Sequence, residues 1–302
     1  MVKKSGRDKP GQPRGWRPEE ADRRRPKPPE GAAPRPRRVA RAETGPVPDR
    51  AAAGETEALT ILHGRQVLYG FHTVAAALAN PRRKVHRVFA TSNAAHRLSE
   101  MAPGALPLPM AVRAEALDRL LGAEVVHQGV AAEVEPLVAP DIHDLPAEGL
   151  ILVLDQVTDP HNVGAILRSA AAFGVRALVV TERHSPEFTG VLAKTSSGGL
   201  EHVPIIAVGN LAQALTLLGE RGFWRVGLDS DGDMPLETAV ASAPVALVLG
   251  AEGKGLRRLT RERCDVLARL DVPGAVKSLN VSNAAAVALY AIGRTLSVPS
   301  AR

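Results

Sequence analysis

From about Leu59 onward, apolar residues occur in short runs that are separated by polar turns. Continuous apolar runs of this length are typical of parallel strands that are buried on both faces. They predict strands at 150–154, 177–180, 205–208, 226–228 and 245–249. Helical spacing of apolar residues predicts helices at 163–173 and 212–218, and an alanine-rich helix at 282–296. The alternation predicts an α/β domain over residues 150–302, with helices on both faces of a parallel sheet.

A smaller α/β unit is predicted before this domain, over residues 59–138. Gly70 marks a turn that precedes a helix to Leu78. Further elements are expected as strands at 85–90 and 130–134 and helices at 94–101 and 116–121. Prolines and acidic residues then predict a linker at 139–149.

The first 58 residues have a different composition, which is basic and rich in proline. Residues 1–50 hold 15 Lys and Arg against 7 Asp and Glu, and 10 of the 24 prolines, so the other 252 residues carry 23 basic and 25 acidic groups. A segment with so few apolar residues cannot offset its ordering entropy, and we expect it to be a disordered tail. It is either an arm that holds RNA phosphates without reading sequence, or a solubilising extension. Its acidic residues and prolines disfavour a transit peptide.

Composition excludes several classes of site. A single cysteine, Cys264, excludes an intrachain disulfide and every cysteine-cluster metal site. No pair of histidines has helical metal-ligand spacing beside a carboxylate, so no metal is expected. We find neither an apolar run long enough for a membrane span nor a secretory signal, and we expect a cytoplasmic protein.

Three loops carry the candidate chemistry, and the first two follow predicted strands directly. In the loop at 155–168, Asn162 lies where the N-cap of the next helix is expected, and Arg168 lies about two turns further on. Taken alone, Arg168 is more simply explained as a surface residue of an amphipathic helix, because charged residues are mostly exposed. The loop at 250–256 reads G-A-E-G-K-G-L, and its glycines leave backbone amides accessible to a ligand, although an ordinary tight turn has the same pattern. It lacks the dinucleotide fingerprint, which excludes a nucleotide-dependent dehydrogenase.

The third loop, at 270–283, is rich in hydrogen-bonding side chains and leads into the last predicted helix. It has a strand-like start and a Pro-Gly turn, followed by Ser278, Asn280, Ser282 and Asn283. The simplest expectation for Ser282 is that it caps the final helix.

In this order and at these spacings, the three loops resemble the SpoU (TrmH) family of RNA ribose 2′-O-methyltransferases of the SPOUT superfamily. The resemblance extends from about Leu150 to Val298 and includes the segment 194–204. Residues 68–78 and the His127-Gln-Gly-Val130 turn are similar to the small L30e-like RNA-binding domain of the branch that methylates guanosine in 23S rRNA.

The resemblance implies a trefoil-knotted catalytic domain, which would be a rare exception to unknotted topology. It also implies a homodimer and S-adenosylmethionine as the cofactor, held by backbone groups of Gly250, Leu270 and Leu279. The catalytic cluster that it implies consists of Asn162, Arg168, Glu252, Ser278 and Asn280. Where the family commonly reads Ile-Pro-Met before the glycine, this chain reads Leu270-Asp-Val-Pro-Gly274, so that loop is expected to differ in detail.

The implied reaction is methylation of a ribose hydroxyl, most directly of a guanosine in 23S rRNA. A guanidinium keeps its proton in proteins, so we expect Arg168 to fix the target phosphate and stabilise the forming alkoxide. Glu252 would orient it, and the other polar residues of the cluster would shape the pocket. The alternatives are methylation of tRNA or another rRNA site, and a non-catalytic RNA-binding factor in ribosome assembly. The L30e-like unit favours rRNA, and the complete polar cluster favours an enzyme.

Overall fold

The computed structural model describes residues 59–183, 185–186, 190–240, 242–276 and 278–297. All of them belong to one compact unit, Gly54–Arg302. The expectation of a disordered tail falls on residues 1–58, outside the described residues. No helix in the described ranges is long and apolar enough to cross a membrane.

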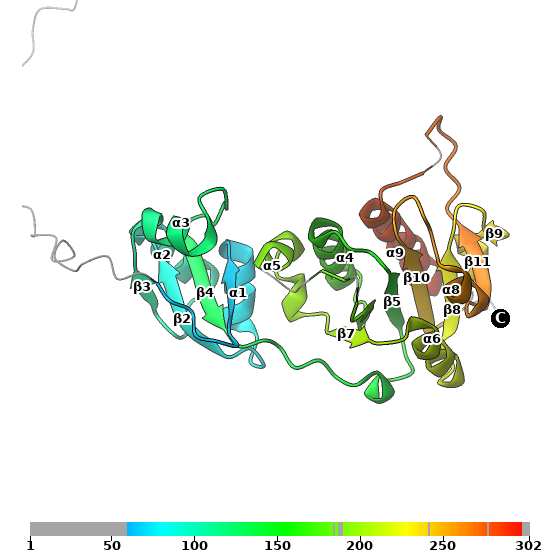
Figure 1. The fold of residues 1–302 in the computed structure, drawn as a ribbon, viewed down its shortest axis with the longest axis horizontal. Helices are drawn as coiled ribbons and strands as arrows, with labels where there is room; N and C mark the ends of the chain where they lie inside the picture. The colour runs from blue at the N-terminus through cyan, green and yellow to red at the C-terminus, as the bar shows by residue number, and fades with distance from the viewer. Residues whose placement is uncertain (1–58, 184, 187–189, 241, 277, 298–302) are drawn as a thin grey trace, which may run out of the picture. The chain divides into compact units, whose positions relative to one another are not determined.

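A seven-stranded sheet forms the larger part of the fold (Figure 1). Its strand order is β7-β6-β5-β10-β8-β11-β9, and every pair of neighbours is parallel. The strands are β5 (Leu150–Asp155), β6 (Leu178–Thr181), β7 (Ile205–Val208), β8 (Trp224–Leu228), β9 (Met234–Pro235), β10 (Val245–Gly250) and β11 (Val266–Arg269). The predicted parallel α/β domain is therefore confirmed.

Helices cover both faces of this sheet, as the continuous apolar runs predicted. Successive side chains of β5 alternate between two hydrophobic clusters, with Leu152 and Leu154 in one and Ile151 and Val153 in the other. The first cluster packs under α4 (Pro160–Ala172) and α9 (Val281–Ser297), and the second under α6 (Leu211–Glu220). Three shorter helices complete the domain: α5 (Gly190–Ser196), α7 (Leu236–Ala239) and α8 (Arg258–Glu262).

The smaller domain contains a four-stranded sheet with the order β1-β4-β2-β3. Its strands are β1 (Gln66–Tyr69), β2 (Val85–Ala90), β3 (Pro109–Ala111) and β4 (Val130–Val134). Central β4 runs antiparallel to both of its neighbours, whereas β2 and β3 are parallel. The helices are α1 (Phe71–Ala79), α2 (Ser92–Met101) and α3 (Ala114–Leu121).

The segment between the two domains holds one turn of 3-10 helix, η1 (Ile142–Asp144). A second, η2 (Gly199–Glu201), follows α5. Both lie in stretches for which the sequence predicted no regular element.

Candidate functional site

The three loops leave the same edge of the seven-stranded sheet. β5 and β10 are parallel neighbours in which Asp155 is paired with Gly250, so the first and second loops start side by side. The third loop follows β11, which is separated from β10 only by β8 (Figure 1). The carboxyl ends of parallel strands form the usual ligand-binding edge of an α/β sheet.

The first loop enters α4 through Asp159, whose side chain accepts a hydrogen bond from the His161 amide at 3.0 Å. Pro160 occupies the first turn. The sequence-based placement of Asn162 at the N-cap is therefore wrong, because a carboxylate before a proline supplies a stronger start signal. Asn162 lies instead within the first turn of the helix and is half-buried, while Arg168 is exposed on the same helix.

Close packing fixes the position of α4. A Cβ atom at Gly164 would lie 2.7 Å from Thr195 Cβ and 2.9 Å from the Leu192 carbonyl oxygen in α5. At Gly199, a Cβ would lie 3.2 Å from Arg168 Cα. The segment from α5 to η2 thus packs directly against the backbone that carries Arg168.

The second loop folds back on itself. The Gly255 amide donates to the Ala251 carbonyl at 2.9 Å, and a Cβ at Gly250 would lie 2.2 Å from the Gly255 carbonyl carbon. Gly253 and Gly255 have φ values of 76° and 64°, which other residues adopt only with strain. Glu252 is exposed in this narrow turn.

The third loop meets the second through one contact. Asn280 Nδ2 donates to Glu252 Oε2 at 3.3 Å. The Asn280 carboxamide oxygen also accepts hydrogen bonds from the Ser282 amide at 2.9 Å and the Ser282 hydroxyl at 2.6 Å. Asn280 therefore caps α9, and the expectation that Ser282 is the cap is wrong because the helix already begins at Val281.

The structure brings together two of the five predicted catalytic side chains, Glu252 and Asn280. Ser278 is exposed in the third loop. Within the described ranges, no hydrogen bond joins Ser278, Arg168 or Asn162 to another member of the cluster. The strand-like start expected at Leu270 is wrong, because β11 already ends at Arg269.

Backbone groups at the edge of the sheet are available to a ligand. Leu270 and Leu279 are partly exposed, and neither has a backbone hydrogen bond to any other described residue. Gly250, the third predicted cofactor-binding residue, ends β10 at the same edge. A ligand recognised by main-chain donors and acceptors fits these positions.

Sequence reasoning missed an ion pair beneath the loops. The Asp155 side chain is fully buried, and it accepts hydrogen bonds from Arg257 Nε at 2.6 Å and from the Arg257 amide at 3.0 Å. The sequence did contain a signal for this pair, because Asp155 directly follows the apolar run 150–154. A carboxylate buried at the end of such a strand requires a positively charged or hydrogen-bonding partner. The pair connects the end of β5 to the end of the second loop.

Cys264 offers no chemistry to this edge. Burial raises the pKa of its thiol to about 12, and the thiol donates to the Thr260 carbonyl at 3.3 Å. A protonated, partly buried thiol is a poor nucleophile.

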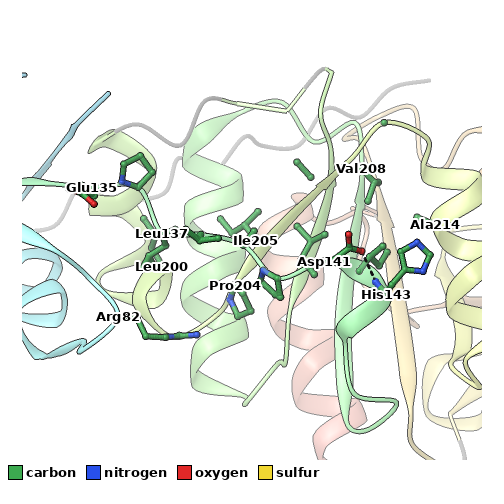
Figure 2. Close-up of a pocket in the computed structure, with 18 of the residues that line it drawn as sticks. Arg82, Glu135, Leu137, Asp141, His143, Leu200, Pro204, Ile205, Val208 and Ala214 are labelled. Carbon is green, nitrogen blue, oxygen red and sulfur yellow. Dashed lines mark hydrogen bonds between the residues drawn. The ribbon is translucent and has the colours of Figure 1, made fainter. Parts of the chain in front are cut away.

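A separate cavity of about 1090 Å³ lies along the segment that joins the domains (Figure 2). Leu137, Asp141 and His143 line it from that segment, and Ile205 and Val208 line it from β7. It includes none of the predicted site residues, so its size alone does not make it the candidate site.

Comparison with known proteins agrees with the position of the three loops. Residues 149–290 match the model of the SpoU rRNA Methylase family. A Pseudomonas aeruginosa protein named 23S rRNA (guanosine-2′-O-)-methyltransferase RlmB is 43% identical over 239 residues, which span 75% of this chain and 95% of the relative. The chain belongs to the SpoU methylase family. A Yersinia pestis relative with the same name is 39% identical over 76% of this chain and 97% of its own length.

The smaller domain and the fold match members of this family as well. Residues 67–139 match a family described as RNA 2′-O ribose methyltransferase substrate binding. The SpoU methyltransferase AviRb from Streptomyces viridochromogenes, solved in complex with the cofactor AdoMet, has a TM-score of 0.66 and 25% identity. That match covers 76% of this chain and 90% of AviRb.

Proposed function

We propose that this SpoU family protein transfers a methyl group from S-adenosylmethionine to a ribose 2′-hydroxyl of RNA. The observation that carries the proposal is the convergence of three loops at one sheet edge, where Glu252 and Asn280 are in contact. A pure RNA-binding factor would have no need of this arrangement. The AviRb complex with AdoMet supports the choice of cofactor.

The proposed substrate is a guanosine in 23S rRNA. Relatives from Pseudomonas aeruginosa and Yersinia pestis carry that activity in their names, and this chain covers at least 95% of each. The match of residues 67–139 to a substrate-binding family supports an RNA substrate. Methylation of tRNA or another rRNA site is the alternative that the experiment below distinguishes.

S-Adenosylmethionine supplies an activated methyl group when it is bound. The residues that would hold it are Gly250, Leu270 and Leu279, through the main-chain groups described above. Main-chain recognition explains why the cofactor site contains no charged signature in the sequence.

The remaining tasks are to position the ribose and to handle one proton. Arg168, which keeps its positive charge, would bind the target phosphate and stabilise negative charge that develops on the 2′ oxygen. Glu252 would orient that guanidinium, while Asn280 holds Glu252 in place. Asn162 and Ser278 would complete the pocket around the ribose. Holding the hydroxyl in line with the methyl group supplies much of the rate enhancement in such a transfer.

We also propose that the smaller domain is an L30e-like unit that binds RNA. Its two motif segments lie together, because the Phe71 amide donates to Gln128 Oε1 at 3.2 Å and the Gly70 amide donates to the Val130 carbonyl at 3.2 Å. The Arg97 guanidinium carbon lies 4.3 Å from the centre of the Phe71 ring. An arginine oriented on an aromatic ring is well suited to phosphate or base contacts.

The trefoil knot, the homodimer, the domain boundaries at 58, 138 and 149 and the cytoplasmic location remain our proposals. One feature supports the homodimer. Phe173 at the end of α4 and Val287 and Tyr290 on α9 are 42%, 47% and 59% exposed, and the two rings meet edge to face at 6.4 Å. Adjacent exposed apolar side chains on neighbouring helices are typical of an interface.

A labelling experiment tests the function. The protein is incubated with radiolabelled S-adenosylmethionine and total RNA from cells that lack the corresponding methyltransferase. We expect label in 23S rRNA. Label in tRNA alone would overturn the substrate assignment, and absence of label from all RNA would favour the non-catalytic binding factor.

A further inference from the structure

A second cavity lies beside the candidate site, beyond the carboxyl ends of β5, β6 and β7. Its volume is about 530 Å³. Gln156 lines it after β5, Thr181 ends β6 within it, and Gly209 lines it after β7. The fourth wall is the start of α8, with Arg257 at its N-cap and Arg258 as its first residue.

The lining of this cavity is strongly basic. It includes three arginines, Arg183, Arg257 and Arg258, and no aspartate or glutamate. The sequence beyond residue 50 is close to neutral as a whole, since residues 51–302 carry 23 basic and 25 acidic groups. A local concentration of positive charge in a concave site attracts anions.

The Arg257 guanidinium is held in position by a buried carboxylate. Arg257 Nε donates to the fully buried Asp155 carboxylate, yet the Arg257 side chain is 47% exposed. Its two terminal nitrogens form no hydrogen bond with any described residue. An arginine oriented through Nε presents its terminal N–H groups to a ligand at little entropic cost.

The other two arginines are exposed at the cavity, and one of them forms a weak ion pair. Arg183 is exposed and has no ion pair with any described residue. Arg258 pairs with Glu262 one turn along the short helix, but the two side chains are 77% and 52% exposed. Exposed ion pairs of this kind are weak, so a phosphate can compete with Glu262.

Neutral donors complete the cavity. Leu211 and Ala212, the first residues of α6, line it, and their amides lack helical acceptors because they belong to the first turn. Asn210 caps the helix by accepting from the Gln213 amide at 3.2 Å. The Thr181 hydroxyl lies 3.4 Å from that of Ser185. Main-chain amides, hydroxyls and arginines together match the oxygens of a phosphodiester.

The cavity is connected to the candidate site at two points. Gln156 begins the loop that leads to Asn162, and Arg257 follows the loop that carries Glu252. Of the cofactor-binding positions proposed above, Gly250 ends β10, and Leu270 follows β11, which lies beyond β8. None of these positions lines the cavity, so an anion bound there would adjoin the first two loops without occupying the cofactor site.

We propose that this cavity binds a backbone phosphate of the RNA substrate close to the nucleotide that is methylated. This inference rests on the proposed function for the identity of the RNA. It assigns Arg183, Arg257 and Arg258 to substrate positioning. We expect these arginines to contribute to the affinity for RNA and to its salt dependence. Their effect on the rate of methyl transfer should be much smaller.

The test uses the full-length protein and unmodified 23S rRNA transcribed in vitro, with binding measured by filter retention at three salt concentrations. Arg183→Ala and Arg258→Ala are the variants, since both side chains are exposed. Replacing Arg257 would leave Asp155 buried without its partner, so it is kept. Arg176→Ala is the matched control, because Arg176 is an exposed arginine at the opposite end of β6, where its amide donates to the Leu150 carbonyl.

The double variant Arg183→Ala/Arg258→Ala is expected to raise the Kd for RNA by about 10-fold and to reduce the salt slope by about 1–2, while Arg176→Ala changes neither. Turnover at saturating RNA should stay within about 2-fold of the wild type, because the methyl-transfer residues are untouched. Unchanged affinity and slope in the double variant would overturn the proposal, as would a loss of turnover with unchanged affinity. If the wild type bound RNA without methylating it, the proposed function would fail, and the binding measurement would still decide this inference.

Discussion

At the residue scale, two hydrogen-bonded pairs, Asn280 with Glu252 and Asp155 with Arg257, orient polar side chains at the loop edge of the sheet. Asn280 binds Glu252 with its amide nitrogen and caps α9 with its amide oxygen, so one side chain couples the second loop to the last helix. The Asp155 carboxylate likewise orients Arg257, by accepting a hydrogen bond from its Nε. Preorganised side chains lose little entropy when a substrate binds.

The Arg168→Ala variant tests the most important of these assignments. Loss of a group that stabilises the negative charge developing on the 2′ oxygen should lower turnover at saturating RNA by about 10²-fold or more, with the affinity for S-adenosylmethionine little changed. Turnover with saturating RNA and calorimetric titration with the cofactor are the two measurements. Near-normal turnover, or loss of cofactor binding in proportion to turnover, would contradict the assignment.

Site residues could be predicted from the sequence where they belong to a motif. They could not be predicted where their role depends on a contact with a residue far away in the sequence. The resemblance of the loops to the SpoU family singled out Glu252 and Asn280, and the structure places their side chains 3.3 Å apart. The N-cap of α4 was misplaced because Asn162 and Asp159 are both good capping residues, and only the Asp159 contact to the His161 amide distinguishes them. The role of Asp155 depends on Arg257, which is 102 positions away in the sequence.

At the element scale, long apolar runs predicted strands well and short elements were missed. β5, β6, β7 and β10 occur within one residue of the expected positions, because strands buried on both faces require continuous apolar side chains. By contrast, β3 has three residues and starts at Pro109, and α8 has five residues, so neither is long enough to show a period. Their conformation comes from the elements packed against them.

Packing of α4 on α5 gives a prediction at this scale. Gly164→Ala places a methyl group 2.7 Å from Thr195 Cβ and 2.9 Å from the Leu192 carbonyl oxygen, which forces the helices apart. We expect a loss of stability of about 1–3 kcal/mol despite the higher helix propensity of alanine. The free energy of unfolding is measured by urea titration. A stability equal to or above that of the wild type would show that these helices can separate without cost.

The carboxylate of Glu133 on β4 gives a pH prediction. Burial raises its pKa, but hydrogen bonds from Arg87, from the Leu62 amide and from Arg65 outweigh burial and lower the pKa to about 2. The folded-state pKa is depressed, so the stabilisation is present above the ordinary value of 4.5 and is lost as the pH falls from 4.5 toward 2.

Thermal unfolding followed between pH 7 and pH 2 tests this linkage. The wild type should lose stability across the stated range, and Glu133→Gln should be less stable at neutral pH and show a shallower dependence. Parallel curves for the two proteins would contradict the role of Glu133. Glu135→Gln, two residues further along the chain, is the comparison. Lys84 and His86 also lower the pKa of that carboxylate, but its side chain is 45% exposed, so we expect a smaller change in the pH dependence.

At the scale of the whole molecule, a buried ion pair connects the small sheet domain to the larger one. Arg83 and Glu201 have side chains that are each 1% exposed, and their closest atoms, Nη2 and Oε1, lie 2.7 Å apart. Asn80 Nδ2 donates to the same carboxylate at 2.7 Å, and Arg83 also donates to the Glu135 carbonyl at 2.8 Å. Neither residue was recognisable from the sequence, because they lie 118 positions apart.

Breaking this pair should destabilise the protein strongly. Arg83→Met leaves a buried carboxylate without its partner and is expected to cost about 3–5 kcal/mol, whereas Arg83→Met/Glu201→Leu should recover most of that loss. A double-mutant cycle by urea unfolding measures the coupling. Additive effects of the two substitutions would show that the pair does not connect the domains energetically.

We propose that the chain methylates the 2′-hydroxyl of a guanosine in 23S rRNA. The most direct measurement uses S-adenosylmethionine with a trideuterated methyl group, unmodified 23S rRNA and nucleoside mass spectrometry after complete digestion. We expect trideuterated 2′-O-methylguanosine, abundant with the wild-type protein and reduced about 10²-fold or more with Arg168→Ala. A labelled methyl group on a nucleobase, or no labelled nucleoside at all, would contradict it.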